Sequence, residues 1–413
     1  MLTWEYPPRT VGGLARHVAG ISQALVDKGV EVEVITTGED GFGQEIGDFG
    51  QVSVHPARPY ALPSLNFVSD IQHLNFSFLE QAVKLINSLG RVDLIHAHDW
   101  LVAYAARALK HIYQVPLICT IHATEFGRNH GLHNDLQRYI SSVEWWLTYE
   151  AWKVIVCSES MRGEVQAIFQ LPADKIEVIN NGINPEEFKV PVKKEFNRAK
   201  YALPEEKIVF YIGRLVQEKG VQTLLEAAPQ ILSLQPNVKF IIAGTGPYEA
   251  ELKNLAAFLG LGEKVNFLGF IDDEERNALY SYADLSVFPS LYEPFGIVAL
   301  EGMAAGTPIV VSDTGGLGEI VKHQVNGLKF LTGNPASLAE QVVRALTDGD
   351  LREKMVKQAK EEVLNKYSWS SLAEKTKNLY ERVLKESRGN SSWLPVWLRK
   401  EAEHKRLVRR YDL

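Results

Sequence analysis

Residues 207–234 read KIVFYI, then GRLVQEKG, then VQTLLEAAPQILSL, and this stretch decides the fold. The first run is apolar and too short for a helix, whereas the last has apolar side chains at helical spacing. A short apolar run followed by a turn and a helix is typical of a parallel β-strand and its crossover helix. The same alternation recurs along most of the chain, so we predict an α/β protein with parallel sheets.

The expected strands fall into two groups, each suited to one doubly wound domain. They are Val30–Thr36, Val52–Val54, Leu94–His96, Leu117–Ile121, Val154–Cys157 and Ile176–Ile179, then Lys207–Ile212, Lys239–Ala243, Val265–Phe267, Leu285–Phe288 and Pro308–Val311. Between the groups, residues 184–203 carry two prolines and a charged run, as domain boundaries often do. We therefore expect domains at residues 1–185 and 186–371, followed by a C-terminal crossover helix and tail at residues 372–413.

The first domain has no obvious first strand. In a doubly wound domain this strand would have to lie within Met1–Trp4, before the turn at Pro7-Pro8. Two explanations stay open at this point: a shortened first strand, or a chain whose true start lies upstream.

The composition excludes several classes of protein. With 44 Lys plus Arg against 51 Asp plus Glu, the net charge of -7 gives no general attraction to nucleic acid or anionic lipid. No window approaches about 18 consecutive apolar residues, and the N-terminus lacks a signal-peptide pattern, so we expect a cytoplasmic protein without a membrane span. The two cysteines, Cys119 and Cys157, lie in apolar runs without CxxC spacing and predict no redox motif.

Loops that follow strands are the place to search for a site, because doubly wound sheets bind ligands beyond the carboxyl ends of their strands. Three such loops are rich in glycine and open a helix: Gly12-Gly13, Glu293–Gly296 and Gly315-Gly316. Glycine permits close approach of the backbone, and the helix N-terminus offers unpaired N–H groups to an anion. Another loop carries Arg214 and Lys219, which suit a diphosphate but taken alone also fit solvated surface side chains.

Motifs in a fixed order run through the chain: EYPP at 5–8, VGGL at 11–14, HAHDW at 96–100, TIHATE at 120–125, GRLVQEKG at 213–220, PSLYEPFGIVALE at 289–301, AGTP at 305–308 and TGGL at 314–317. Together they resemble the retaining nucleotide-sugar glycosyltransferases of the GT-B type, in which two Rossmann-like domains face each other across a cleft. Within that family they look most like the glycogen and starch synthases. In family members a late helix crosses back onto the first domain, and Leu372–Ser387 is our candidate for it.

The resemblance implies how a nucleotide-sugar donor would be bound. Arg214 and Lys219 would hold its diphosphate, assisted by backbone N–H groups of Gly12 and Gly13. Glu301 would accept hydrogen bonds from the ribose. Since Arg and Lys supply the positive charge at this place, we expect no metal or other cofactor to be needed.

The resemblance also assigns residues to the transferred sugar. Glu293 would bind its far hydroxyls, and His122 would lie near its C6 hydroxyl and anomeric carbon. The backbone N–H groups expected to assist belong to Phe295, Gly296 and Ile297. Asp99 and Glu125 would lie near the reaction centre or on the acceptor side. The expected catalytic group is therefore His122, Arg214, Lys219 and Glu293.

Patterns for other cofactors are weak. The run His96–Asp99 leaves a metal site as a minor alternative, and Asp348-Gly349-Asp350 follows no strand, so it fits a turn that caps a helix. Gly244-Thr245-Gly246 lacks the third glycine of a dinucleotide fingerprint, since Glu249 stands there.

The leading functional hypothesis is transfer of glucose from UDP- or ADP-glucose to an α-1,4-glucan with retention of configuration. The main alternative keeps the donor chemistry but uses a small-molecule or lipid-linked acceptor, as in sucrose-forming, trehalose-forming or cell-envelope enzymes. A non-enzymatic glucan-binding protein is disfavoured because every donor-side motif position holds the expected residue. Front-face attack and double displacement stay open as mechanisms.

Overall fold

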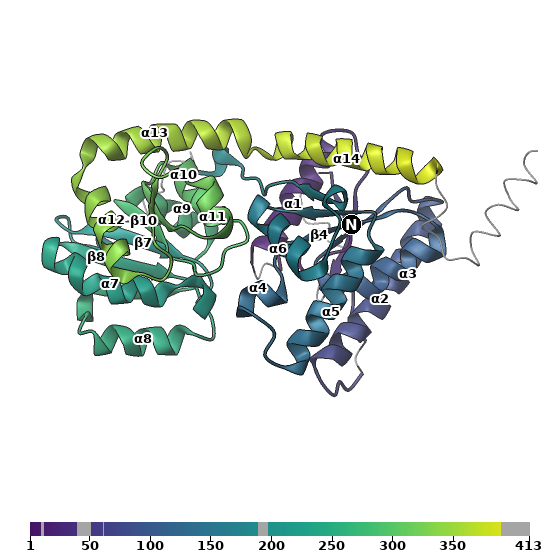
Figure 1. Ribbon diagram of the computed structural model, residues 1–413, viewed down its shortest axis with the longest axis horizontal. Helices are drawn as coiled ribbons and strands as arrows, with labels where there is room; N and C mark the ends of the chain where they lie inside the picture. The colour runs from purple at the N-terminus through teal and green to yellow at the C-terminus, as the bar shows by residue number, and fades with distance from the viewer. Residues whose placement is uncertain (10–11, 39–50, 61, 189–196, 390–413) are drawn as a thin grey trace, which may run out of the picture.

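The computed structural model describes residues 1–9, 12–38, 51–60, 62–188 and 197–389 (Figure 1). These residues form two α/β domains side by side, each built on a parallel sheet that helices cover. The predicted fold class is confirmed. The end of the chain that we assigned to the tail, residues 390–413, lies outside the described residues.

The first residues of the chain complete the sheet of the first domain. This sheet consists of β1 (Glu33–Thr37), β2 (Ser53–Ala57), β3 (Ile95–His98), β4 (Leu117–Ile121), β5 (Lys153–Val156) and β6 (Ile176–Val178). Leu2 forms parallel bridges to Ile35 of β1 and to Ala97 of β3, which joins the β1–β2 pair to the other four strands. The residues around Leu2 thus stand in the place of the first strand.

The second domain has a six-stranded sheet in the order β12-β11-β10-β7-β8-β9. Its strands are β7 (Lys207–Ile212), β8 (Val238–Ala243), β9 (Val265–Gly269), β10 (Leu285–Phe288), β11 (Ile309–Ser312) and β12 (Leu328–Phe330). The strand order reverses between β7 and β10, and in the first domain between Leu2 and β3. A doubly wound sheet opens a crevice at this point, so the loops after these strands are placed to bind a ligand.

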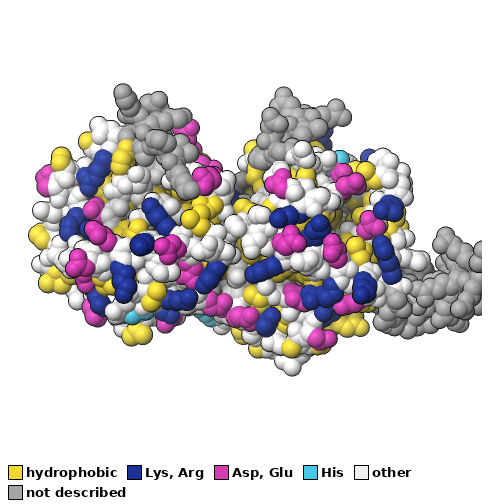
Figure 2. Space-filling view, turned by 90° about the horizontal axis from the view of Figure 1, so that it is seen from above, with side chains coloured by type: hydrophobic (Ala, Val, Ile, Leu, Met, Phe, Trp, Pro, Cys, Tyr) yellow, Lys and Arg dark blue, Asp and Glu magenta, His cyan; other side chains and the backbone are white. Residues whose placement is uncertain are grey.

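The helices connect the strands and cover the sheets. They are α1 (Gly13–Val26), α2 (Phe67–Leu89), α3 (Ala103–Tyr113), α4 (Glu125–Asn129), α5 (Asp135–Glu150), α6 (Glu159–Phe169), α7 (Val221–Leu234), α8 (Glu249–Phe258), α9 (Asp273–Tyr282), α10 (Ile297–Ala305), α11 (Gly315–Ile320), α12 (Pro335–Thr347), α13 (Gly349–Lys366) and α14 (Trp369–Gly389). Among the described helices, none is both long and apolar enough to cross a bilayer. On the face shown in Figure 2, basic and acidic side chains are interspersed over both domains.

Helices α13 and α14 run along one side of the molecule, α13 over the second domain and α14 over the first (Figure 1). Leu372 and Val383 of α14 are fully buried in one apolar cluster with Ile21 of α1. Trp369, at the start of α14, lies so close to Gly20 of α1 that a Cβ on this glycine would come within 2.2 Å of the indole. The expected crossing of a late helix back to the first domain is confirmed.

The structure differs from the expected elements at several places. The sequence predicts a helix at Phe76–Ser88, whereas α2 begins at Phe67, because Asn66 caps it by accepting the N–H of Ser69. Helix α6 was not predicted, although Ser158 caps it by accepting the N–H of Met161. Strand β12 was also missed, since its three residues are too few to show a period.

Replacing Leu372 by alanine tests the packing of α14. Its side chain is fully buried, so we expect Leu372→Ala to lower the free energy of unfolding by about 2–5 kcal/mol. Chemical denaturation followed by circular dichroism measures the change. Leu364→Ala on α13, where the side chain is half exposed, is the control and is expected to cost much less. Equal losses in both variants would show that α14 does not depend on this contact.

Candidate active site

A cavity of about 470 Å³ lies between the two domains, at the carboxyl ends of their strands. This volume is within the usual range of small-molecule sites. All but one of the predicted site residues line it: Gly12, Gly13, Asp99, His122, Arg214, Lys219, Glu293, Phe295, Gly296, Ile297 and Glu301. The tertiary structure therefore brings together residues that the sequence spreads over both domains.

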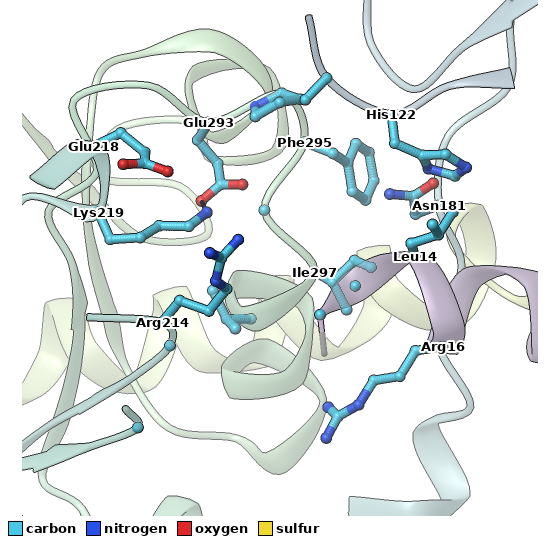
Figure 3. A pocket seen from close by; sticks show the side chains of 18 of the residues that line it. Leu14, Arg16, His122, Asn181, Arg214, Glu218, Lys219, Glu293, Phe295 and Ile297 are labelled. Atoms are coloured by element: carbon cyan, nitrogen blue, oxygen red, sulfur yellow. Dashed lines mark hydrogen bonds and ion pairs between the residues drawn. The ribbon is translucent and has the colours of Figure 1, made fainter. Parts of the chain in front are cut away.

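Two helices from different domains begin at this cavity (Figure 3). Helix α1 starts at Gly13 after the N-cap Gly12, and α10 starts at Ile297 after the N-cap Gly296. A Cβ on Gly13 would lie 3.3 Å from Cδ1 of Ile297, so the two helix ends are in contact. The N–H of Gly12 donates to Oε2 of Glu5 at 3.2 Å. The partial positive charges of the two helix ends meet in one place, which suits an anionic ligand.

Lys219 and Glu293 link the loop after β7 to the loop after β10. Nζ of Lys219 lies 2.7 Å from Oε2 of Glu293, which also accepts a hydrogen bond of 3.1 Å from the hydroxyl of Ser290 (Figure 3). Gly220 follows Lys219 with a φ of +68°, and a Cβ there would lie 1.9 Å from the carbonyl oxygen of Pro289. Only glycine fits this close approach of the two loops.

Like that of Arg128, the guanidinium of Arg214 is an available cation of the site. It is exposed in the cavity, and Figure 3 shows it directed toward Lys219 and Glu293. Its side chain has no hydrogen bond or ion pair with any residue of the described ranges. The backbone of Glu293 is fixed in turn by Gly316, whose N–H donates to its carbonyl at 2.9 Å. The carboxylate of Glu293 thus lies beside Lys219, with which it forms an ion pair, and near Arg214, which has no such pair among the described residues.

Arg16 of α1 is a site residue that our sequence reasoning missed. It lines the cavity and crosses to the second domain, where Nη1 lies 2.5 Å from Oε1 of Glu301 and Nη2 lies 2.9 Å from Oδ1 of Asp273. Glu301 is buried and also accepts a hydrogen bond of 3.1 Å from the hydroxyl of Tyr280. The signal that could have found Arg16 is its position, one helical turn after the Gly12-Gly13 motif.

His122 follows β4 and is fixed by two neighbours. Its backbone N–H donates to Oδ1 of Asp99 at 2.8 Å, and its Nε2 lies at hydrogen-bond distance, 3.2 Å, from Nδ1 of His98. Burial lowers the pKa of His122 to about 3, so the ring is neutral at neutral pH. The ring therefore presents one N–H and one lone pair, and no charge, to its surroundings.

Asp99 has a strained backbone at the edge of the cavity. Its φ of 61° and ψ of 174° lie in a region that is almost restricted to glycine, and such strain tends to be kept at functional sites. Burial raises the pKa of Asp99 to about 6, although Arg128 and the N–H of His122 act in the opposite direction. The side chain of Asp99 holds the His122 loop in place, and the strained backbone and the buried carboxyl are the energetic cost of this contact.

Two other predicted positions lie away from the cavity. Glu125 does not line it: this residue begins α4, its N–H donates to the carboxylate of Glu144 at 3.0 Å, and its own carboxylate accepts from Asn129. Its acceptor role stays a prediction. Asp348 caps α13 by accepting the N–H of Leu351 at 3.0 Å, which agrees with the helix-capping turn predicted there.

Comparison with known proteins identifies the family to which this chain belongs. Residues 193–362 match the family model of the glycosyl transferases group 1, and residues 11–187 match the model of glycosyltransferase family 4. The chain is also 44% identical over 386 residues to an uncharacterized glycosyltransferase of Methanocaldococcus jannaschii. The aligned region covers 92% of this chain and 97% of that protein. The chain belongs to the group 1 glycosyltransferases. The resemblance seen in the motifs is confirmed.

Two further similarities place this glycosyltransferase more closely. It is 34% identical over 417 residues to the glycogen synthase of Mycobacterium tuberculosis, with 96% of this chain and 97% of that protein covered. Among solved structures, sucrose-phosphate synthase from Thermosynechococcus elongatus superimposes with a TM-score of 0.81 at 26% identity, covering 93% of this chain and 98% of that chain. Both support the GT-B arrangement of two Rossmann-like domains. Their names differ in the acceptor, so family membership alone leaves the acceptor open.

Asp99→Asn tests the strained carboxyl beside His122. Asparagine keeps an oxygen for the His122 N–H and tolerates positive φ, but it carries no charge. Because the folded state raises the pKa of Asp99 to about 6, the wild type loses stability as the pH rises through 6, whereas below about pH 4 the carboxyl is protonated whether folded or not. We expect the variant to gain unfolding free energy over wild type at pH 8, and the gain to shrink toward pH 4.

Denaturant titrations of both proteins at pH 4.5 and pH 8 measure this difference. Asp135→Asn, at an exposed position of α5, is the control and is expected to show no such change with pH. A gain that is equal at both pH values, or larger at the lower one, contradicts the interpretation.

Proposed function

We propose that this glycosyltransferase transfers glucose from UDP-glucose or ADP-glucose to the end of an α-1,4-glucan, with retention of configuration. The observation that carries the proposal is the convergence of Arg214, Lys219 and two helix N-termini on one cavity. Carboxyl groups also line the cavity, so the positive charge is local to Arg214, Lys219 and the two helix N-termini, in a protein whose net charge is -7. This positive charge suits the diphosphate of a nucleotide sugar. The 34% identity to a glycogen synthase supports glucose and a glucan as the other partners.

In the proposed reaction, charge develops on the leaving diphosphate as the bond to the anomeric carbon breaks. Arg214 is exposed and unpaired within the described residues, so it can take up this charge without first giving up a partner. Lys219 would turn from the carboxylate of Glu293, 2.7 Å away, toward the diphosphate. Glu293 would then be free to accept hydrogen bonds from the sugar hydroxyls. Preorganised cations of this kind lower the barrier more than any other single device.

The remaining residues are proposed to position the donor and its sugar. Glu301 would accept hydrogen bonds from the ribose hydroxyls, and Arg16 would hold Glu301 in place from the opposite domain. His122, neutral and fixed by Asp99, would lie against the sugar near its anomeric carbon. Backbone N–H groups at the start of α10, from Phe295, Gly296 and Ile297, would complete the sugar pocket. We propose that no metal ion takes part in the transfer.

A small-molecule acceptor is the second candidate. Its support is the superposition on sucrose-phosphate synthase, a protein whose name indicates a small sugar phosphate as product. The donor residues proposed above would have the same roles in that case. The two candidates differ only in what the first domain presents to the acceptor.

Removing either donor cation tests the reaction. We expect Arg214→Ala and Lys219→Ala each to lower turnover by about 10²–10³-fold, because an electrostatic stabiliser of the leaving group is lost in a site with few alternatives. Steady-state release of nucleoside diphosphate measures the loss, and circular dichroism checks that the fold is kept. Lys84→Ala, on the exposed side of α2, is the matched control. Activity near the wild-type level in either site variant would contradict the assignment.

A panel of donors and acceptors tests the substrates. UDP-glucose and ADP-glucose are each combined with glycogen, maltooligosaccharides and small sugars or sugar phosphates, and the anomeric configuration of the product is read by NMR. We expect transfer to the glucans with an α-linked product. Transfer to small sugars alone would favour the second candidate, and a β-linked product would exclude retention.

A further inference from the structure

Three histidine rings lie together beside the cavity in the first domain. His17 is on α1, His98 ends β3 and His122 follows β4. One ring nitrogen of each lies within 4.8 Å of a ring nitrogen of the other two. The ring centroids of His17 and His122 are 4.7 Å apart, and those of His98 and His122 are 5.5 Å apart. The pairing of β3 with β4, and the position of α1 against them, create this group.

The hydrogen bonding of the group is incomplete. Nδ1 of His17 and Nε2 of His98 are fully buried and make no hydrogen bond of good geometry in the described part of the chain, although the side chain of Asn181 lies close enough to His17 to act on its pKa. Buried polar atoms without a partner are uncommon, and an ion is one of the usual reasons for them. This reason applies to His17 only, because the nitrogen of His98 that lies beside His122 is Nδ1 and its Nε2 would stay without a partner. The neighbouring His96 differs, since its two ring nitrogens bond to the hydroxyls of Tyr380 and Thr120. His96 therefore has no nitrogen left for a metal, which excludes it from the site considered at residues 96–99.

The chemistry of the three rings suits a transition-metal ion. Burial lowers the pKa of His122 to about 3 and those of His17 and His98 well below the usual value, so each ring is neutral and has a lone pair to give. Nδ1 of His98 and Nε2 of His122 are 3.2 Å apart. Two nitrogen ligands of one tetrahedral zinc ion lie about 3.3 Å apart. His17 would have to move by up to about 1.5 Å to complete the set.

The site also has an entry path and a nearby negative charge. His122 lines the cavity, so an ion can arrive from there, and its fourth coordination position would face the cavity. The carboxyl of Asp99 accepts the backbone N–H of His122 at 2.8 Å and lies at the same edge of the cavity. This hydrogen bond fixes the backbone of one of the three proposed ligands.

We propose that His17, His98 and His122 form a site for one divalent first-row transition-metal ion such as Zn²⁺, and that the bound ion inhibits the enzyme. Three imidazoles with an open fourth position are a set that Zn²⁺ accepts readily. The ion takes no part in the transfer. It inhibits because it holds His122, which then cannot lie against the sugar. The binding stands on the geometry alone, whereas the inhibition rests on the proposed function.

Metal binding is measured first, without donor or acceptor. The full chain is freed of metal with a chelator and titrated with Zn²⁺ against a chromophoric indicator, and Co²⁺ is used in parallel for its visible spectrum. We expect one Zn²⁺ per chain, an absorption spectrum of tetrahedral Co²⁺, and a higher melting temperature with Zn²⁺ than without it.

His17→Gln and His98→Gln are the test variants, and His133→Gln, at an exposed position before α5, is the matched control. Loss of an outer-shell partner alone weakens metal sites by about 10- to 100-fold, so loss of a ligand should weaken Zn²⁺ binding by at least about 100-fold. Circular dichroism checks the fold, and two variants on different elements guard against the failure of one. Equal Zn²⁺ binding by wild type and both variants, or none by wild type, overturns the site.

The inhibition is measured separately, as nucleoside diphosphate release at increasing Zn²⁺. For the wild type we expect half-inhibition at the Zn²⁺ concentration that half-fills the site. For His17→Gln we expect the same degree of inhibition only at about 100-fold more Zn²⁺. Full activity with the site filled overturns the inhibitory role. A protein that binds Zn²⁺ through these residues but transfers no glucose would contradict the proposed function and leave the site supported.

Discussion

The packing of α14 on α1 is the contact on which the arrangement of the cavity depends. Helix α14 leaves the second domain and buries Leu372 and Val383 against α1, whose N-terminus opens at the cavity. The same helix contacts a neighbour of the histidine group, since the hydroxyl of Tyr380 lies 2.6 Å from Nδ1 of His96. The C-terminal helix thus holds together the two halves of a site to which it contributes no residue.

The position of the two domains determines which charged side chains form ion pairs in the cavity. The cations there are partly compensated by carboxylates of the second domain, through the pairs of Lys219 with Glu293 and of Arg16 with Glu301. Arg16 comes from the first domain, so one of the two pairs exists only when the domains are together. An anionic donor would therefore enter a site in which Arg16 and Glu301 are already positioned, whereas Lys219 would have to leave Glu293.

Much of the fold and of the donor site could be predicted from local patterns. Strands β7 and β10 were predicted at their observed limits, because buried parallel strands are continuous apolar runs. The loops with Arg214, Lys219 and Glu293 were predicted because glycine and charge stand directly after such strands. Strand β12 and helix α6 were missed, since three residues show no period and the α6 cap was not recognised.

The sequence by itself determined the α/β class, the two Rossmann-like domains and the loops that line the cavity, because spacing and turn residues act locally. The tertiary structure decided what no local pattern contains. It placed Arg16 against Glu301, left Glu125 outside the cavity, and brought His17 to His98 and His122. Each of these depends on how two sheets face each other and on the path of α14. Contacts between residues far apart in the chain follow from packing, to which every element contributes.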